Sequence, residues 1–178
     1  MHETIELPET EERGSNPYTV PVSVTISILA VLVAAVTLLG HRAHTEELLL
    51  QSKATDQWAY FQAKNIRLHE METMVDLLDT VGVQDQEKAK TVGEKYKKEV
   101  DRYKDDKTEI SSEAKNLEAE RDVISRRADR FDGGEALLEI GLVICSITLL
   151  TKRKGFWLTG MAVGAIGVIV ALTGFIAR

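Results

Sequence analysis

Cysteine is almost absent from the chain, since Cys145 is the only one in 178 residues. An intrachain disulfide is therefore excluded, and the compartment cannot be read from the thiols. Catalytic motifs are missing as well: the sequence has no glycine-rich phosphate loop, nucleophile elbow, HExxH or CxxC. The sequence thus proposes neither an enzyme nor a cofactor. An enzyme is only the third reading, which a deep pocket with converging polar groups would revive.

Charge is missing from three stretches, Val20–Gly40, Ile140–Thr151 and Gly155–Ala177, although 28% of the residues are charged. The first and third are about as long as a helix needs to cross ~30 Å of hydrocarbon. The second is shorter and follows Glu139 closely, but only the loop TKRKG separates it from the third. We therefore interpret these two as a membrane hairpin. A soluble four-helix protein would need amphipathic partners to cover such helices, and the rest of the chain is heavily charged.

The predicted fold is all-α, with three transmembrane helices and a long antiparallel, coiled-coil-like helical hairpin inserted between the first and the second. The first span is expected to remain as an anchor, because it has no basic start and no small-x-small cleavage site. The predicted segments are an acidic flexible tail (1–19), transmembrane helix 1 (20–40), the soluble helical hairpin (41–133), transmembrane helix 2 (134–151), a short basic loop (152–155) and transmembrane helix 3 (156–177).

Apolar residues recur at alternating spacings of four and three along both arms of the hairpin, which is the spacing of a coiled-coil seam. Seven of nine such positions on the first arm and nine of eleven on the second are apolar or aromatic. Two helices alone bury little, so we expect a further helix or other subunits to help. The seam comprises Leu50, Ala54, Gln57, Phe61, Lys64, Leu68, Met71, Val75 and Leu78 on the first arm, and Tyr96, Val100, Tyr103, Lys107, Ile110, Ala114, Leu117, Arg121, Ile124, Ala128 and Phe131 on the second.

Glycines mark the expected breaks between these helices. No proline or glycine interrupts the chain from His41 until Gly82, where the first arm is expected to end. Asp85 is then the N-cap of the second arm. Because the arms differ in length, the turn can also lie nearer Val92–Gly93. The pair Gly133–Gly134 predicts a hinge before the second span.

Titratable residues gather where both arms return to the same membrane surface. Glu135 and Glu139 are four residues apart and share a helix face. Glu139 lies about one turn inside the apolar stretch, where an unpaired acid is costly. One reading is an ion-pair clamp with the basic residues opposite, and the other is a cation or proton site at the membrane mouth. The two histidines of the cluster lack a third fixed ligand, so no metal is assigned. The cluster comprises His41, Arg42, His44, Arg130, Asp132, Glu135 and Glu139.

Small residues form stripes on the first and third spans. Such stripes let helix backbones approach closely, either within one three-helix bundle or between subunits. The stripe of the third span comprises Gly160, Gly164, Gly167 and Gly174, and that of the first comprises Ala30 and Ala34 in one row with Ser23, Ser27 and Thr37.

Several segments together resemble a known family: GHRAH, DQWAYFQAKNIR, ADRFDGGE, LVICSITLLTKRKGFW and GVIVALTGF. They are similar to a bacterial family of small membrane proteins described as domain of unknown function 4337. The resemblance runs from about Gly40 to Phe175 and does not include the acidic tail. It implies a bacterial origin and three spans, and it supplies no catalytic residue.

Composition and charge limit the classes of function that the chain can have. A net charge of -6 argues against a nucleic-acid partner. We expect a membrane-anchored structural or interaction protein that forms homo-oligomers in the lipid bilayer and offers its hairpin to a protein partner. The alternative is an oligomeric ion channel or transport component with a juxtamembrane carboxylate and histidine site.

The basic loop bears on orientation, because the cations of Lys152–Lys154 are the only polybasic run and resist translocation. This places the loop and the tail in the cytoplasm and the hairpin in the periplasm, around a bacterial inner membrane. Arginines flank the opposite side of the spans, so a cytoplasmic hairpin stays open as the alternative.

Overall fold

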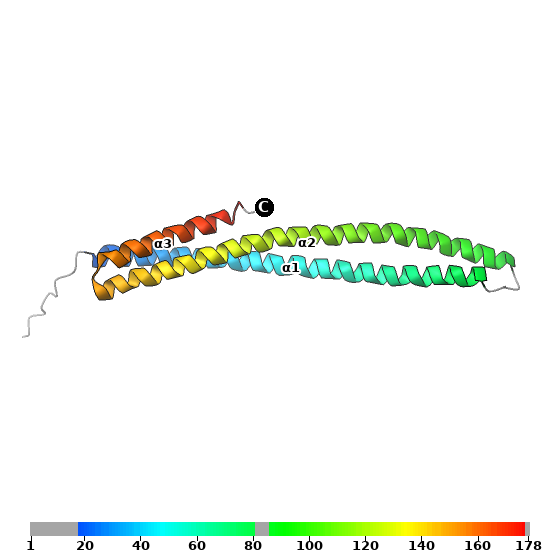
Figure 1. Ribbon diagram of the computed structural model, residues 1–178, viewed down its shortest axis with the longest axis horizontal. Helices are drawn as coiled ribbons and strands as arrows, with labels where there is room; N and C mark the ends of the chain where they lie inside the picture. Colours follow the sequence, from blue (N-terminus) through cyan, green and yellow to red (C-terminus); the bar gives the residue numbers. More distant parts are fainter. Residues whose placement is uncertain (1–17, 81–85, 177–178) are drawn as a thin grey trace, which may run out of the picture. The chain divides into compact units, whose positions relative to one another are not determined.

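The computed structural model describes residues 18–80 and 86–176, and every regular element among them is an α-helix. Helix α1 covers Thr19–Thr80, α2 covers Gln86–Thr151 and α3 covers Lys154–Thr173 (Figure 1). Each of the three has a stretch long and apolar enough to cross a membrane. This confirms the all-α prediction with three candidate spans. The acidic tail, the break at Gly82 and the cap at Asp85 lie outside the described residues.

The two long helices continue without a break from their apolar stretches into their charged parts. The predicted hinge at Gly133–Gly134 is therefore wrong, because both residues lie inside α2. The alternative turn at Val92–Gly93 is wrong for the same reason. Glycine at 134 serves packing instead, since a Cβ there would lie 2.7 Å from the Cβ of Ala171 on α3.

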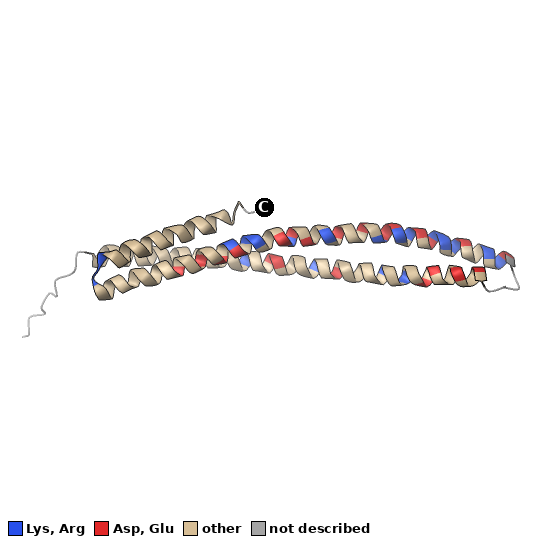
Figure 2. Cartoon of the chain, viewed as in Figure 1, with Lys and Arg blue, Asp and Glu red and all other residues tan. Residues whose placement is uncertain are grey.

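The chain divides into two compact units, which we describe separately. The membrane unit comprises residues 18–40 and 129–176, and the charged unit comprises 41–80 and 86–128. Figure 2 shows that acidic and basic residues alternate along the charged unit, whereas α3 carries charge only at its start. The two units thus correspond to two solvents, hydrocarbon and water.

In the membrane unit, α2 and α3 approach until their backbones touch. A Cβ on Gly141 would lie 2.8 Å from the carbonyl oxygen of Gly160, and a Cβ on Gly167 would lie 2.9 Å from that of Gly134. Leu29 adds α1 to this contact, because its side chain fills the space beside Gly164. Close approach of this kind supplies van der Waals contact where no hydrophobic force drives helices together.

In the charged unit, the side chains at the predicted seam positions are shielded from solvent. All nine on α1, from Leu50 to Leu78, are buried or half-buried, and so are those on α2 from Tyr96 to Ala128. The polar residues that interrupt the pattern bind across to the other helix. The Lys64 ammonium lies 2.7 Å from a carboxylate oxygen of Asp106, and this hydrogen bond raises the pKa of Lys64 against the opposing effect of burial.

The connection from α2 to α3 is shorter than the predicted loop 152–155, because α3 begins at Lys154. Lys152 has φ of 55° and donates its backbone N–H to the carbonyl oxygen of Thr148 at 2.8 Å. This left-handed residue ends α2 as glycine often does elsewhere. Arg153 is the N-cap of α3 and makes no side-chain capping bond.

Candidate functional site

The membrane unit contains a hydrogen bond between a hydroxyl and a carboxylate of two different helices. The Thr37 hydroxyl on α1 donates to Oε1 of Glu135 on α2 at 2.6 Å, and it also lies 2.9 Å from the carbonyl oxygen of Val33. Both side chains are half-buried. The sequence placed Glu135 among the candidates but assigned its partner to the basic residues of α1. Thr37 is therefore a partner that charge counting could not identify.

The position of Glu139 along α2 can be compared with positions along the neighbouring helix α3. Gly141 packs against Gly160 and Gly164, which stand near the middle of the 20 residues of α3. Glu139 precedes Gly141 by two residues, so it stands beside the middle of α3. The sequence predicts that Glu139 lies about one turn inside the apolar stretch of α2, and its depth in a membrane stays a prediction.

Glu139 differs from Glu135 in its surroundings. Its side chain is exposed on α2, and no hydrogen bond or ion pair joins it to another described residue of the membrane unit. An unpaired carboxylate inside hydrocarbon costs roughly 2.5 to 3.5 kcal/mol on insertion scales, so contact with water or with a partner would lower this cost. The two acids that share a face by sequence thus have different environments.

The rest of the juxtamembrane cluster divides between the two units. Arg130 and Asp132 belong to the membrane unit and are exposed, and Asp132 lies against Gly40, where a Cβ would approach its Oδ1 to 3.2 Å. In the charged unit, His41 and Arg42 are exposed. The predicted pairing of Glu135 and Glu139 with the basic residues would join the two units, and it stays a prediction.

The remaining histidine, His44, has an acidic neighbour within its own helix. Its Nδ1 lies 3.3 Å from Oε2 of Glu47. Within residues 18–80 and 86–176, no three His, Cys, Asp or Glu side chains form a group that could hold a metal ion.

The glycine stripe of α3 packs inside the chain. Gly160, Gly164 and Gly167 are buried against α1 and α2, and a Cβ on Gly174 would lie 3.0 Å from the Phe131 ring. The sequence left packing within the bundle and packing between subunits equally open. The contacts show that the α3 glycines pack within the chain. The matching glycines on α2 were not recognised in the sequence. Gly134 and Gly141 are seven residues apart, as are Gly160 and Gly167 on α3.

The stripe of the first span has the opposite placement. Ala30 and Ala34 are exposed on α1, as are Ser23 and Ser27 in the same row. The membrane unit therefore leaves one small-residue face uncovered.

The charged unit also has an apolar groove that the sequence reading overlooked. Ile66, Met74 and Leu77 on α1 are exposed by 59%, 41% and 53%, and they line the groove together with Met71 and Tyr96. Ile66, Met74 and Leu77 lie outside the seam positions, which were the residues considered in the sequence. The signal that could have found them is their own spacing of eight and three residues.

Comparison with known proteins places the chain in one family. The family model described as Domain of unknown function (DUF4337) matches residues 19–177, nearly the whole chain. No curated protein and no solved structure matches the sequence.

Proposed function

The chain belongs to the DUF4337 family, whose description names no activity, and we propose on this premise that it is a membrane-anchored structural and interaction protein that self-associates. Its membrane unit anchors the chain, and its charged unit presents a helical surface in water. Support comes from the exposed apolar groove, the uncovered small-residue face of α1 and the absence of any catalytic motif from the sequence.

We further propose that the charged unit is an antiparallel, coiled-coil-like hairpin. The contacts that support this run in opposite order along the two helices, because residue numbers fall on α2 as they rise on α1. The pairs are Gln51 with Arg121, Trp58 with Glu118, Lys64 with Asp106, Glu72 with Lys104 and Asp79 with Lys97.

The observation that carries self-association is the apolar groove near the far end of this hairpin. The hydrophobic cluster beneath it is small, with Leu68, Val100 and Tyr103 buried and Met71 packed against them. Ile66, Met74 and Leu77 add a second apolar row that the pairing of α1 with α2 leaves uncovered. Spacings of eight and three residues fit a covering helix. The helical hairpin of a second copy supplies one, so we assign the groove to a second copy.

Charge substitution in this groove should separate the copies. We expect Ile66→Glu combined with Leu77→Glu to reduce the detergent-extracted complex to monomers, because burying either carboxylate at the contact without a partner is unfavourable. The measurement is size-exclusion chromatography with light scattering. Val92→Glu is the matched control, since Val92 is also an exposed apolar residue of the charged unit and does not line the groove.

Crosslinking tests the same contact in membranes. Met74→Cys should form a disulfide-linked or maleimide-linked dimer, whereas the wild type should not, because its single cysteine is buried. A wild-type protein that is a monodisperse monomer in mild detergent, or a double glutamate variant of unchanged size, would contradict self-association through the groove.

A second candidate function is an ion channel or transport component, and the placement of Glu139 favours it. An exposed carboxylate beside the middle of α3 suits a water-filled axis between subunits. We expect Glu139→Gln to abolish a cation or proton flux in liposomes and to leave the size of the complex unchanged. Glu120→Gln, an exposed acid of the charged unit, is the control that should conduct as the wild type does. Equal flux for wild type, Glu139→Gln and protein-free liposomes would remove this candidate.

For localisation, we propose the inner membrane of a bacterial cell, with the Lys152–Lys154 loop in the cytoplasm and the charged unit in the periplasm. The three loop cations support this orientation, because short basic loops resist translocation. The exposure of Lys152, Arg153 and Lys154 adds support, since anionic lipids and water can reach all three.

A further inference from the structure

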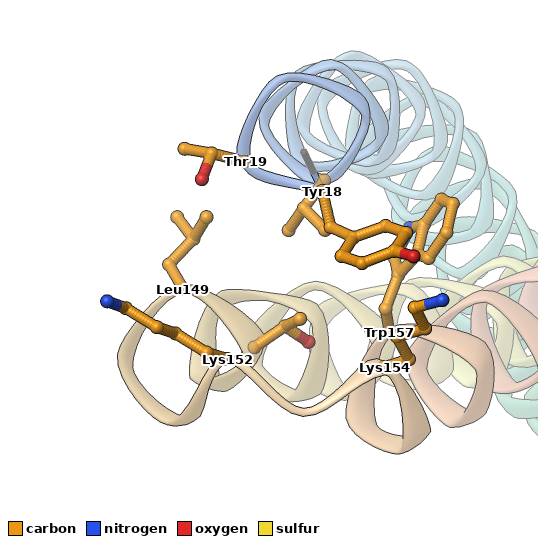
Figure 3. Close-up of a pocket in the computed structure, with 8 residues that line it drawn as sticks. Tyr18, Thr19, Leu149, Lys152, Lys154 and Trp157 are labelled. Carbon is orange, nitrogen blue, oxygen red and sulfur yellow. The ribbon is translucent and has the colours of Figure 1, made fainter. Parts of the chain in front are cut away.

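At the end of the membrane unit that holds the basic loop, the ends of all three helices line one pocket. Tyr18 and Thr19 come from the start of α1, Thr148 and Leu149 from the end of α2, and Trp157 from the start of α3 (Figure 3). Lys152 and Lys154 also line it, one on each side of the turn between α2 and α3. None of the described residues that line the pocket is acidic. The pocket therefore has a positive electrostatic potential from its own side chains.

A buried polar group without a partner lies in this pocket. Thr148 is only 4% exposed, and its hydroxyl oxygen has no hydrogen-bond partner among the described residues. Most threonines of the spans donate to a carbonyl oxygen one turn earlier, as Thr25 does to Pro21 at 2.9 Å. A buried hydroxyl that forgoes this bond loses stabilisation unless a ligand or a water completes it.

The backbone adds further donors at the same place. Helix α3 starts at Lys154 without a side-chain cap, so its first N–H groups are available to an anion. A Cβ on Gly155 would meet nothing within 4 Å, which shows that the space beside this first turn is open. Cations, a helix N-terminus and an unpaired hydroxyl together form a set of donors that suits a phosphate.

Two of the side chains that line the pocket, Lys154 and Trp157, make contacts that hold them in place. The Lys154 ammonium lies 3.9 Å from the centre of the Tyr18 ring, and the Trp157 indole N–H donates to Oγ1 of Thr25 at 3.1 Å. Figure 3 shows Tyr18, Lys154 and Trp157 on one side of the pocket and Thr19, Leu149 and Lys152 on the other. The contact with Tyr18 restricts Lys154, so an anion binds beside it at a lower cost in conformational entropy than beside an unrestrained lysine.

We propose that this pocket binds the headgroup phosphate of an anionic phospholipid. The cavity volume is about 30 Å³, which admits one phosphate oxygen to the Thr148 hydroxyl. The remainder of the phosphate then lies at the mouth between Lys152 and Lys154, which stand on opposite sides of the pocket in Figure 3. The lipid, rather than free phosphate, is the assigned source because Leu149, which lines the pocket, and the adjacent Leu150 are exposed by 41% and 85% and offer apolar surface to acyl chains. The membrane unit alone lines the pocket, so this site does not depend on self-association.

The test measures lipid binding by the full-length protein in non-ionic detergent, by native mass spectrometry and by thermal shift. Phosphatidylglycerol, phosphatidylcholine and inorganic phosphate are the three probes. We expect phosphatidylglycerol to bind about 25-fold more tightly than phosphatidylcholine, because the two lysines that line the pocket contribute about fivefold each. Lys152→Gln and Lys154→Gln should each lose about fivefold of this preference. Lys97→Gln, which removes an exposed cation of the charged unit, should lose none.

Thr148 separates a built pocket from general charge attraction. Thr148→Val should weaken phosphatidylglycerol binding by about tenfold, the loss expected for one hydrogen bond to a charged group. Thr148→Ser keeps the hydroxyl and should bind as the wild type does, which guards against misfolding as the cause. Equal binding of the two lipids, or wild-type binding by Thr148→Val, would overturn the proposal. Tight binding of inorganic phosphate alone would overturn the assignment to lipid.

Discussion

Replacing Gly160 with alanine is expected to destabilise the membrane unit by more than about 3 kcal/mol, because overpacking at a backbone contact exceeds the usual cost of overpacking in a core. The new Cβ would lie 2.5 Å from Sγ of Cys145, 2.7 Å from the carbonyl oxygen of Gly141 and 2.9 Å from the backbone nitrogen of Cys145. A side chain can rotate away from such a contact, but two of these atoms belong to the backbone of α2. Relief therefore requires α2 and α3 to separate.

Separation is costly here because close approach is what holds these helices together. Lipid tails are as apolar as the side chains they replace, so van der Waals contact between backbones has no hydrophobic substitute. Gly155→Ala is the matched control on the same helix, since a Cβ there would meet nothing within 4 Å. We expect Gly155→Ala to unfold at or slightly above the wild-type temperature in detergent, because alanine favours a helix by up to about 1 kcal/mol. Equal unfolding temperatures for the two variants would show that the helices do not meet at Gly160.

Replacing Thr37 with valine is expected to cost roughly 2.5 to 3.5 kcal/mol, the scale of an unpaired acid inside a span. Valine keeps the size and branching of threonine and removes the donor that lies 2.6 Å from Glu135. The Glu135 carboxylate then loses this hydrogen-bond partner, which disfavours the folded bundle. Chemical unfolding of the detergent-solubilised protein at pH 7 measures this cost.

Two controls isolate the bond between the helices. Thr159 donates the same bond to a carbonyl oxygen one turn earlier, that of Gly155 at 2.9 Å. It is exposed on α3 and bonds to no acidic side chain among the described residues. Thr159→Val should therefore change stability by less than about 0.5 kcal/mol, as surface substitutions usually do. In a Glu135→Leu background, Thr37→Val should lose most of its effect, because the partner it leaves unpaired is gone. Full additivity of the two substitutions would refute the Thr37–Glu135 bond.

The helices and their covered faces could be predicted well from the sequence. The spacing of four and three picked out positions such as Leu50, Ala54 and Leu68, all of which are buried. The interruptions at Lys64 and Lys107 were also visible in the sequence, but their partners were not. Periodicity is a property of one helix, whereas Asp106 and Asn65 are brought to these lysines by the other helix of the charged unit.

The candidate site could be predicted only in part. Glu135 and Glu139 were identified as acids that share a helix face near a membrane surface, and both were predicted to pair with the same basic residues. The structure distinguishes them, because Thr37 reaches Glu135, while Glu139 stays exposed beside the middle of α3. Their difference depends on the rotation of α2 against α1 and α3, which a single helix pattern does not contain.

The sequence by itself determined the solvent of each segment. Runs without charge specify hydrocarbon and runs dense in charge specify water, because the transfer free energy of each side chain depends little on its distant neighbours. The absence of catalytic motifs and the match to the family are likewise properties of the linear chain. The tertiary structure alone decided what each glycine does. Gly134 reads as a hinge in the sequence and is a helix contact in the fold, because the space that a Cβ would occupy is filled by Ala171, a residue thirty-seven positions away.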